Sequence, residues 1–392
     1  MKVLIITNHF LERNEGGCLA SRAFINAFST LFTDCTLIYP ESEIDIRPFV
    51  SSQLKLVSCK DRRPLLMKGV GVYFGKLHRF HNTVKKYLRK NAVDLIVFDT
   101  SIVSQGLHSF AKKRDLQIIT INHNVEAEYL KDNKPPPLIR IPFLYFMKKT
   151  ERRAVQCSDL GLTLTKFDES KLKTIYAYDN KINLNNLGIF EAPNANIICI
   201  GNDNITKSAM NRFVITGSLS YSQSEISIIE FINKYFPILQ NTINKCELII
   251  AGRNPSERLK TICNHHNQIR LISNPDNMSE IIFWGDIYLC PISMGGGFKL
   301  RIMDALKFGL PILTHEISSR GYESFVQAKM MYVYNSKETF AEALIQMKSK
   351  IFIKGDITKL YEKEFSFLNG VNKLDSILKS GLPGRICNQL NI

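Results

Sequence analysis

The chain has 392 residues, 45% hydrophobic and 22% charged, which is typical of a globular protein and excludes a disordered or fibrous one. Its length exceeds that of one typical hydrophobic core and favours two domains of roughly 150–200 residues. Because no run approaches about 18 uninterrupted apolar residues, the sequence predicts no membrane-spanning helix. The apolar run at 3–6 is too short for the core of a signal peptide, so we expect a cytoplasmic protein.

The net charge of +15 indicates anionic partners. Much of the excess lies in residues 62–90, which hold nine Lys or Arg and no Asp or Glu. Such a field attracts nucleic acid, anionic lipid or phosphorylated substrates. The nine cysteines include no C-x-x-C pair, so we expect free thiols rather than disulfides or a zinc site.

Short apolar runs alternate with helical stretches along the first half of the chain. Successive apolar positions within the runs are typical of parallel strands that are covered on both faces. The alternation predicts a doubly wound parallel sheet. The expected strands are 3–7, 36–39, 54–57, 94–98, 118–121 and 160–165, and the expected helices include 19–31, 74–90 and 104–113.

The Asn-rich stretch 179–211 interrupts this alternation and is expected to connect two domains, 1–200 and 201–392. The sequence therefore predicts an α/β protein with two doubly wound, Rossmann-like domains that face each other across a cleft. The last helix, expected at 360–378, is a candidate for packing back across the domains. The second series of expected strands is 212–216, 247–251, 269–272, 287–290, 311–314 and 331–334.

The strongest chemical signal follows the strand expected at 287–290. Three consecutive glycines, Gly295, Gly296 and Gly297, precede an expected helix with Lys299 in its first turn. Glycines allow backbone N–H groups to approach a phosphate closely, and a helix N-terminus and a lysine add positive charge there.

Asp304 lies on the same helix, which is apolar on nearly every side and is therefore expected to be buried. A buried acid needs a partner, and a ribose diol would provide one. The alternative is an Arg301–Asp304 pair on one helix, with the glycines serving only a tight turn.

Residues 285–322 resemble the donor-binding region of GT-B glycosyltransferases, in the retaining family that assembles bacterial polysaccharides and glycolipids. One branch of that family has three glycines, an apolar residue and a lysine, as Gly295–Gly297, Phe298 and Lys299 have here. Asp304 falls on the second of two glutamates common in the family, and Gly296 falls on the first. The resemblance implies that Lys299 contacts the donor diphosphate and Asp304 the ribose.

Other segments resemble the same family. Gly217 and Ser218 follow the first strand of the second half, and Arg253 follows the next strand and is a candidate second cation. The alternative for Arg253 is a solvated loop charge. Gly16 and Gly17 resemble the glycine loop at the domain cleft, although a plain turn would look the same.

The pattern His123-Asn124-x-Glu126 follows the strand expected at 118–121. The resemblance places a histidine at this position near the acceptor or donor sugar, with Asn124 and Glu126 as further contacts. A histidine at a strand end can exchange a proton near neutral pH. The alternative is a histidine that only fixes the loop backbone.

Residues 62–90 and 134–153 combine cationic and apolar side chains, a pattern that suits the surface of an anionic membrane. The alternative is a solvated helix face that covers the core. No nucleic-acid-binding module surrounds these residues, so nucleic acid is not an expected partner.

Together these features predict a metal-independent glycosyltransferase, and the family resemblance implies that it retains the anomeric configuration and acts in cell-surface polysaccharide synthesis. Its expected partners are a nucleotide-diphosphate sugar as co-substrate, a saccharide or lipid-linked acceptor, and the inner face of an anionic membrane as a peripheral site. No cofactor or metal is expected, because Lys299, Arg253 and the helix end can meet the charge of the leaving diphosphate. Alternatives are a nucleotide-sugar epimerase of this fold and a non-catalytic sugar-nucleotide-binding partner, which the missing first glutamate favours.

Overall fold

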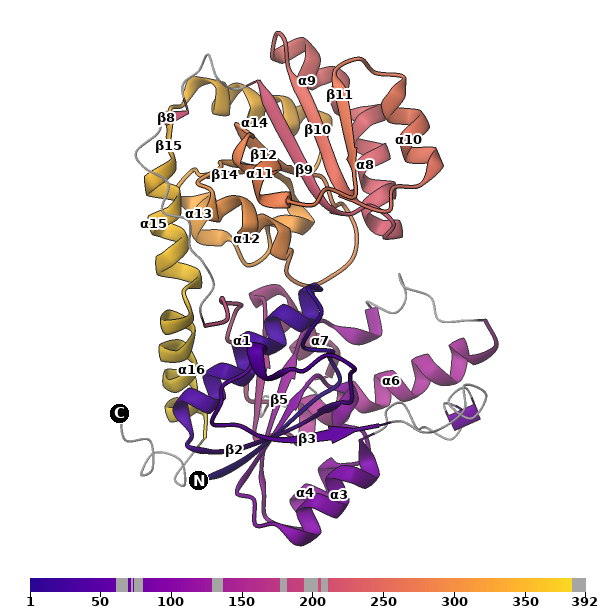
Figure 1. Ribbon diagram of the computed structural model, residues 1–392, viewed down its shortest axis with the longest axis vertical. Helices are drawn as coiled ribbons and strands as arrows, with labels where there is room; N and C mark the ends of the chain where they lie inside the picture. Colours follow the sequence, from indigo (N-terminus) through magenta and orange to yellow (C-terminus); the bar gives the residue numbers. More distant parts are fainter. Residues whose placement is uncertain are drawn as a thin grey trace. The chain divides into compact units, whose positions relative to one another are not determined.

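The computed structural model describes residues 1–60, 70–71, 73, 80–128, 137–176, 182–193, 204–205 and 211–382. The chain forms two compact units (Figure 1). Unit 1 comprises Met1–Ala195 and Phe365–Ile392, and unit 2 comprises Asn196–Glu364. The expected division at residue 200 differs from this one in the last helix, which groups with unit 1.

Unit 1 contains a seven-stranded sheet in the order β3-β2-β1-β4-β5-β6-β7, and every pairing within it is parallel. The central strands are apolar on both faces because helices cover both sides: α3 and α4 pack on one side, and Figure 1 shows α1 on the other. The strands are β1 (Lys2–Thr7), β2 (Asp34–Pro40), β3 (Lys55–Cys59), β4 (Leu95–Asp99), β5 (Gln117–Asn122), β6 (Leu160–Thr163) and β7 (Leu184–Asn186). The helices are α1 (Gly16–Leu31), η1 (Arg47–Phe49), α3 (His81–Lys90), η2 (Ile102–Ser104), α4 (His108–Lys112), α6 (Pro137–Cys157), α7 (Lys166–Tyr176) and α16 (Phe367–Gly381).

Unit 2 contains a six-stranded parallel sheet in the order β11-β10-β9-β12-β13-β14. Its strands are β9 (Arg212–Ser218), β10 (Glu247–Arg253), β11 (Ile269–Ser273), β12 (Ile287–Cys290), β13 (Ile312–His315) and β14 (Met331–Tyr334), and β8 (Asn204–Ile205) pairs antiparallel with β15 (Phe352–Ile353). The helices are α8 (Ser222–Lys234), α9 (Phe236–Thr242), α10 (Glu257–Asn264), α11 (Met278–Phe283), α12 (Leu300–Lys307), η4 (Glu316–Ser319), α13 (Glu323–Gln327), α14 (Lys337–Ser349) and α15 (Lys354–Phe365). The two doubly wound, Rossmann-like sheets confirm the predicted fold class.

The expected helix at 360–378 is two helices, because Ser366 begins a new one. Its side chain accepts from the Asn369 N–H and caps α16. The α16 helix packs against α1, and its Gly370 leaves room for the ring of Phe190. The expected helix at 104–113 is shortened to α4, since Gly106 adopts a φ of 68° that helical residues do not.

One strand lies inside the stretch that was expected to be only a connection. The β7 strand has the sequence Leu-Asn-Asn and pairs with β6. Side-chain amides stabilise its position: Asn183 donates to the carbonyls of Asp159 and Gly381, and Asn186 donates to that of Thr163. Residues 61–69, 72 and 74–79 of the basic stretch 62–90 and its flank lie outside the described residues.

Two further expectations concern cysteines and membrane spans. The seven described cysteines are free thiols, and six of them are buried. None of the described helices combines the length and apolar character needed to cross a bilayer.

Two buried carboxylates lie close to each other: Glu126, which follows β5, and Glu151 on α6. Glu151 accepts hydrogen bonds from the N–H groups of Glu126 and Ala127 and from the hydroxyl of Tyr176, which stabilise its charge. Burial, followed by the negative charge of Glu151, raises the pKa of Glu126 to about 8, and Asn124 hydrogen-bonds to the Glu126 carboxyl. Glu126 is therefore protonated at neutral pH.

Substituting Glu126→Gln should change how stability depends on pH. Between the ordinary pKa of 4.5 and the folded value of about 8, the native state keeps a proton that the unfolded chain releases. Stability of the unmodified protein therefore falls as pH rises through this window, by on the order of a few kcal/mol relative to the variant. Urea unfolding at a series of pH values measures the difference, and parallel profiles of the two proteins would contradict it.

Candidate functional site

Strand order identifies one edge of each sheet as the place for a ligand. In an open parallel sheet, ligands bind beyond the carboxyl ends of the strands, where the order of connection reverses. That reversal lies between β1 and β4 in unit 1 and between β9 and β12 in unit 2. Asp99 ends β4, Gly217 and Ser218 end β9, and the triple glycine lies in the loop after β12.

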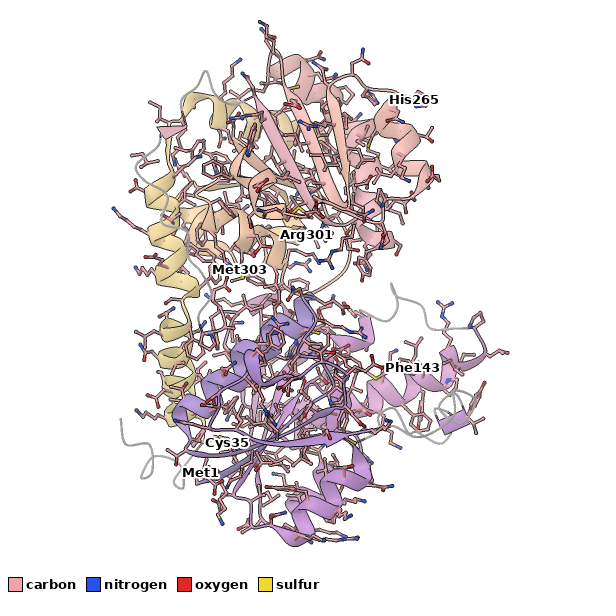
Figure 2. The ribbon with its side chains drawn as sticks, in the orientation of Figure 1. Met1, Cys35, Phe143, His265, Arg301 and Met303 are labelled. Atoms are coloured by element: carbon pink, nitrogen blue, oxygen red, sulfur yellow. The ribbon has the colours of Figure 1, made fainter. Side chains whose placement is uncertain are left out.

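In unit 2, glycines allow a cation to lie against the end of β9. Gly217 and Ser218 at the end of β9 pair with Gly252 and Arg253 at the end of β10. A Cβ atom at Gly217 would lie 2.7 Å from the guanidinium of Arg301, so a larger residue there would displace that guanidinium. Arg301, which is labelled in Figure 2, donates to the Thr216 carbonyl at 3.2 Å and to Ser224 Oγ at 3.1 Å. A guanidinium thus lies at this strand end, while the Arg253 side chain is exposed at the neighbouring one.

The triple-glycine loop is held by side chains from neighbouring elements. The Ser293 N–H donates to Ser227 Oγ at 3.2 Å, and Ser318 Oγ donates to the Ile292 carbonyl at 2.8 Å. Gly295 has a φ of 85°, and a Cβ there would lie 2.4 Å from Oε1 of Gln223. Around Gly296 a Cβ would meet nothing within 4 Å. The loop is therefore fixed in place and open on the side of Gly296.

Gln223 is a residue that sequence reasoning missed. It is the second residue of α8 and is buried, and its Nε2 amide has no hydrogen-bond partner among the described residues. A buried amide without a partner costs about 1–3 kcal/mol, which an anionic oxygen beside the glycine loop would recover. The only signal in the sequence was its position in the first turn of the helix after β9.

Lys299 and Asp304 lie on either side of the start of α12. Lys299 is the N-cap residue, and its Nζ donates to the Gly296 carbonyl at 2.8 Å. The hydroxyl of Tyr322 donates to the Lys299 carbonyl, and the Tyr322 ring lies 4.4 Å from that of Phe298. Lys299 therefore hydrogen-bonds to the glycine loop, the part of the site in which it was expected.

The α12 helix differs from the expectation that it is buried on all sides. It buries only Ile302, Met303, Ala305 and Leu306. The Asp304 side chain is 57% exposed, and its Oδ1 lies 3.8 Å from Nζ of Lys307. The apolar residues outnumber the polar ones in this segment, but helical spacing places them on one face and leaves Asp304 accessible.

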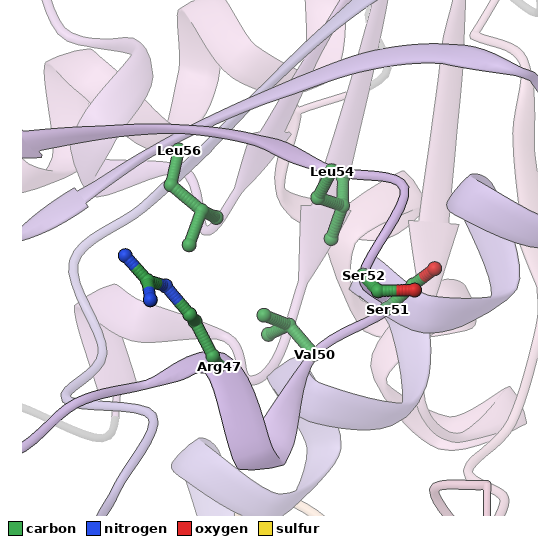
Figure 3. Close-up of a pocket in the computed structure, with 6 residues that line it drawn as sticks. All are labelled: Arg47, Val50, Ser51, Ser52, Leu54 and Leu56. Carbon is green, nitrogen blue, oxygen red and sulfur yellow. The ribbon is translucent and has the colours of Figure 1, made fainter.

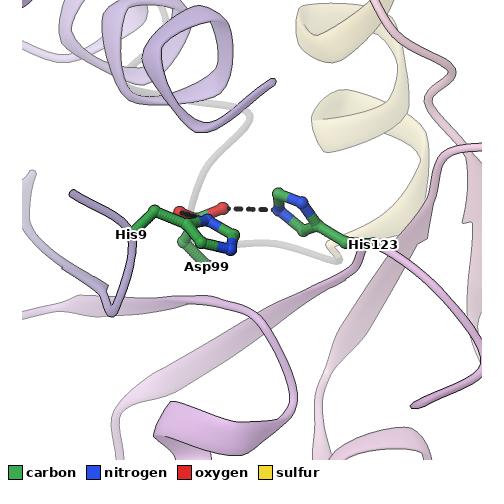
Figure 4. A group of neighbouring side chains, drawn as sticks. All are labelled: His9, Asp99 and His123. Carbon is green, nitrogen blue, oxygen red and sulfur yellow. Dashed lines mark hydrogen bonds and ion pairs between the residues drawn. The ribbon is translucent and has the colours of Figure 1, made fainter. Parts of the chain in front are cut away.

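In unit 1, three side chains converge at the carboxyl edge (Figure 4). His123 follows β5, Asp99 ends β4, and His9 follows β1. His123 Nε2 lies 2.8 Å from Asp99 Oδ1, and His9 Nδ1 lies 3.7 Å from Asp99 Oδ2. Sequence reasoning found His123 but missed Asp99 and His9, because nothing in one sequence shows which strand ends are adjacent.

Gly17 allows His9 to take this position. Gly16 and Gly17 are the first two residues of α1 rather than part of a loop. A Cβ atom at Gly17 would lie 2.9 Å from Nε2 of His9, so any larger residue would displace the imidazole. On its other side, His9 Nδ1 lies 2.6 Å from Ser21 Oγ. The glycine therefore serves close packing of a histidine.

Asp99 is a fully buried carboxylate that stays ionised. Burial alone would raise its pKa, but the charge and hydrogen bonds of His123 and His9 lower the pKa well below its usual range. Thr7 Oγ1 also donates to Asp99 Oδ2 at 2.6 Å. An ionised Asp99 accepts from His123 Nε2–H, so Nδ1 is the nitrogen that can take up a proton.

The same three residues satisfy the donor chemistry of a metal site. One ligand atom from each of His9, Asp99 and His123 lies within 4.8 Å of the other two. Two imidazoles and one carboxylate suit zinc or another transition metal. Without a metal, His123 hydrogen-bonds to Asp99 and His9 to Ser21, so the geometry fits either use.

A pocket outside this edge lies at the amino end of β3. It has a volume of about 340 Å³ and lies beside η1, with Arg47 among apolar and hydroxyl side chains (Figure 3). Leu54 and Leu56 line it at the start of β3, the opposite end of the strand from the site. It therefore contributes nothing to the groups around Asp99.

Three solved structures share the fold over nearly the whole chain. HepE from Anabaena in complex with UDP superposes with a TM-score of 0.64 at 11% identity, over 97% of this chain and all of that one (100%). The lipopolysaccharide outer core galactosyltransferase WaaB has a TM-score of 0.64 at 11% identity, over 97% and 100% of the chains. The pneumococcal O-GlcNAc transferase GtfA, in complex with UDP and GlcNAc, has a TM-score of 0.62 at 11% identity, over 98% and 99%.

Sequence comparison gives a narrower result. A search among curated proteins finds no match. Residues 211–350 match the family of glycosyl transferases group 1, and this range includes the triple-glycine loop, Lys299 and Asp304. The chain therefore has the two-domain GT-B fold, and its residues 211–350 match the glycosyl transferases group 1 family.

Proposed function

We propose that the protein transfers a sugar from a nucleotide-diphosphate sugar to a saccharide or lipid-linked acceptor in cell-surface polysaccharide synthesis. The observation that carries this proposal is the fixed glycine loop of unit 2, which has the buried Gln223 amide on one side and Lys299 at its end. It lies where a doubly wound sheet binds phosphates, in the part of the chain that matches the family model.

The donor diphosphate would meet three cations in unit 2. Lys299 ends the glycine loop, Arg301 lies against Gly217, and Arg253 ends β10. Positive groups that are already in place stabilise the charge that develops on a leaving diphosphate. The exposed carboxylate of Asp304 can accept hydrogen bonds from the ribose hydroxyls. UDP is the first nucleotide to test, because HepE and GtfA were both solved with it.

Unit 1 would supply the proton chemistry. With Nε2 held by Asp99, His123 presents Nδ1 to exchange a proton with a sugar hydroxyl. We further propose that the anomeric configuration is retained and that no metal is needed, as the family resemblance implies. Asn124 and Glu126 stand as sugar contacts in this scheme, although Glu126 is mostly buried beside Glu151.

A second function is favoured by one feature. The absence of a carboxylate at Gly296, where the space is open, removes a group that would hold the donor sugar. A non-catalytic protein that binds sugar nucleotides would tolerate this loss. Nucleotide binding without transfer to any acceptor would support this alternative, and turnover without acceptor would support an epimerase.

We also propose that unit 1 docks on an anionic membrane, and that α6 rather than α3 makes the contact. Val84 and Leu88 of α3 pack on the sheet, so its cations form a solvated helix face. On α6, Leu138 is 85% exposed, Ile141 82% and Tyr145 60%, at spacings that align them on one side. Four cations follow on the same helix: Lys148, Lys149, Arg152 and Arg153. Exposed apolar groups beside cations suit an anionic leaflet.

Nucleotide binding should depend on Lys299 and Asp304. UDP at about 100 times its Kd should stabilise the protein by roughly 2.7 kcal/mol in thermal unfolding.

Lys299→Ala should cost on the order of 2–4 kcal/mol of transition-state stabilisation, and Asp304→Ala should raise the Kd for UDP. Lys337→Ala and Glu342→Ala on α14 are matched controls that should change neither quantity. No thermal shift with UDP or GDP would contradict the assignment of the site.

His123→Ala should lower turnover more than donor affinity. A positioned acid–base group contributes about 10²–10⁴-fold to the rate, so we expect kcat to fall roughly 100-fold or more with little change in the Kd for UDP. His265→Ala, at the exposed end of α10, is the control. Unchanged turnover would leave His123 a loop-fixing residue. Loss of activity in the unmodified protein after treatment with a chelator would instead assign His9, Asp99 and His123 to a metal.

Removing the exposed apolar groups of α6 should reduce binding to vesicles. Each buried aliphatic side chain contributes roughly 1.5–3 kcal/mol, so Leu138→Ser with Ile141→Ser should weaken binding to anionic vesicles by roughly 100-fold or more. The control is Ile345→Ser with Leu368→Ser, two side chains that are also exposed. Vesicle flotation measures both. Equal recovery of the two variants would contradict docking through α6.

A further inference from the structure

A cation-lined pocket lies between α6 and the η2–α4 segment of unit 1. Its volume is about 180 Å³, and neither Asp99 nor His123 is among the described residues that line it. Both segments contact α6, so the walls of the pocket are formed by packed elements of one unit. Its lining residues include Gly106, His108, Phe146, Lys149, Thr150 and Arg153.

Helical spacing places the cations of α6 on the wall of this pocket. Lys149 and Thr150 are adjacent and lie three and four residues after Phe146, and Arg153 lies four and three residues after them, which aligns all four on one side of the helix. Lys149 and Arg153 are exposed, and Thr150 is buried. None of the described residues that line the pocket is acidic. The pocket therefore combines two positive charges with a hydroxyl and has no carboxylate of its own to neutralise them.

His108 adds a buried nitrogen that has no partner. Its side chain is 5% exposed, and its Nε2 makes no hydrogen bond with any described residue. The imidazole ring hydrogen-bonds to the backbone of Ser104. Because Nε2 has no partner, Nδ1 is the nitrogen that makes this bond. Burial, followed by the charges of Arg153 and Lys112, lowers the pKa of His108 to about 4. An unpartnered buried polar atom beside two cations indicates a missing ligand.

We propose that this pocket binds a phosphate group, with Lys149 and Arg153 meeting its charge and His108 hydrogen-bonding to it. A phosphate has oxygens for both cations and for the Thr150 hydroxyl, and a protonated phosphate oxygen can donate to Nε2. This site shares no described lining residue with the groups proposed for glycosyl transfer in unit 1, His123 and Asp99. Two sources offer the group: free phosphate, or the headgroup of a lipid at the surface that α6 would contact.

Binding should be coupled to protonation of His108. The groups that act on its charge are Lys112 on its own helix and Arg153 on α6, while the neighbouring β4 contributes the uncharged ring of Phe98. An anion between the cations and His108 offsets their repulsion and favours the imidazolium. Sulfate keeps its charge across the range of interest, so its affinity should rise as the pH falls from about 7 to about 5.

The decisive comparison uses two double variants of α6 that remove equal charge. Lys149→Ser with Arg153→Ser removes the cations of the pocket, and Lys148→Ser with Arg152→Ser removes two cations of the same helix that do not line it. Calorimetric titration with inorganic phosphate and with sulfate should show affinity roughly tenfold or more weaker in the first variant and little changed in the second. Thermal unfolding checks that both variants fold.

A second arm of the experiment separates the sources of phosphate. Phosphatidylcholine vesicles with and without phosphatidic acid are offered to the same two variants. Calorimetric binding of inorganic phosphate that only the first variant loses supports a site for free phosphate. Binding to phosphatidic acid vesicles alone, again lost only in the first variant, supports a lipid headgroup.

The proposal is overturned if both double variants lose affinity equally. The anion is then attracted by the summed positive charge of α6 and not bound in the pocket. It is also overturned if the unmodified protein binds neither inorganic phosphate, sulfate nor phosphatidic acid vesicles. His108→Phe keeps an aromatic ring and removes Nε2. Sulfate affinity that still rises at low pH in this variant would contradict the coupling to His108. Since the calorimetric arm needs no membrane, its result is distinct from failure of the α6 docking proposal.

Discussion

Parallel pairing throughout both large sheets brings the carboxyl ends of each sheet to one edge, and the chemistry of the protein depends on this constraint. Strands from distant parts of the sequence place Thr7, Asp99 and His123 within hydrogen-bonding distance in unit 1. In unit 2 the same arrangement pairs Gly217 with Gly252 and places the triple-glycine loop at the point where the strand order reverses. The strands that lead to these edges are apolar and buried, so the polar side chains lie at the edges.

These edges contain buried polar groups that a purely structural core would avoid. The ionised Asp99 carboxylate is tolerated because Thr7 and two histidines satisfy it, whereas Gln223 has an amide donor without a partner. Glu126 and Glu151 form a further pair in which one carboxyl must keep a proton. Such groups cost stability in the free protein, and their arrangement at strand ends is what an anionic or hydroxyl-bearing ligand would use.

Most of the fold could be predicted from the sequence, because the central strands are runs such as Leu95–Phe98 in which every side chain is apolar. The β7 strand could not, since Leu-Asn-Asn carries no strand signal and is stabilised by amide hydrogen bonds from Asn183 and Asn186. The exposure of Asp304 was also missed, because composition suggested a buried helix where spacing leaves one side open.

The candidate site divides in the same way. Lys299, the three glycines and His123 stand out in the sequence because they follow apolar strands, and the structure places them at the carboxyl edges. Asp99, Gln223 and Arg301 carry no local signal, and only the order of strands shows what they contact. The guanidinium of Arg301, which belongs to α12, lies at the end of β9. It supplies a positive charge there, because no basic residue directly follows Gly217 in the sequence.

The central claim is that the glycine loop of unit 2 binds a nucleoside diphosphate, and hydrogen–deuterium exchange with and without UDP tests it most directly. Backbone amides in a bound loop exchange more slowly, since the ligand occupies them and suppresses local opening. The account predicts slower exchange in residues 217–224 and 293–300 and unchanged exchange in α14. Protection confined to other segments, or none at saturating UDP, would contradict it.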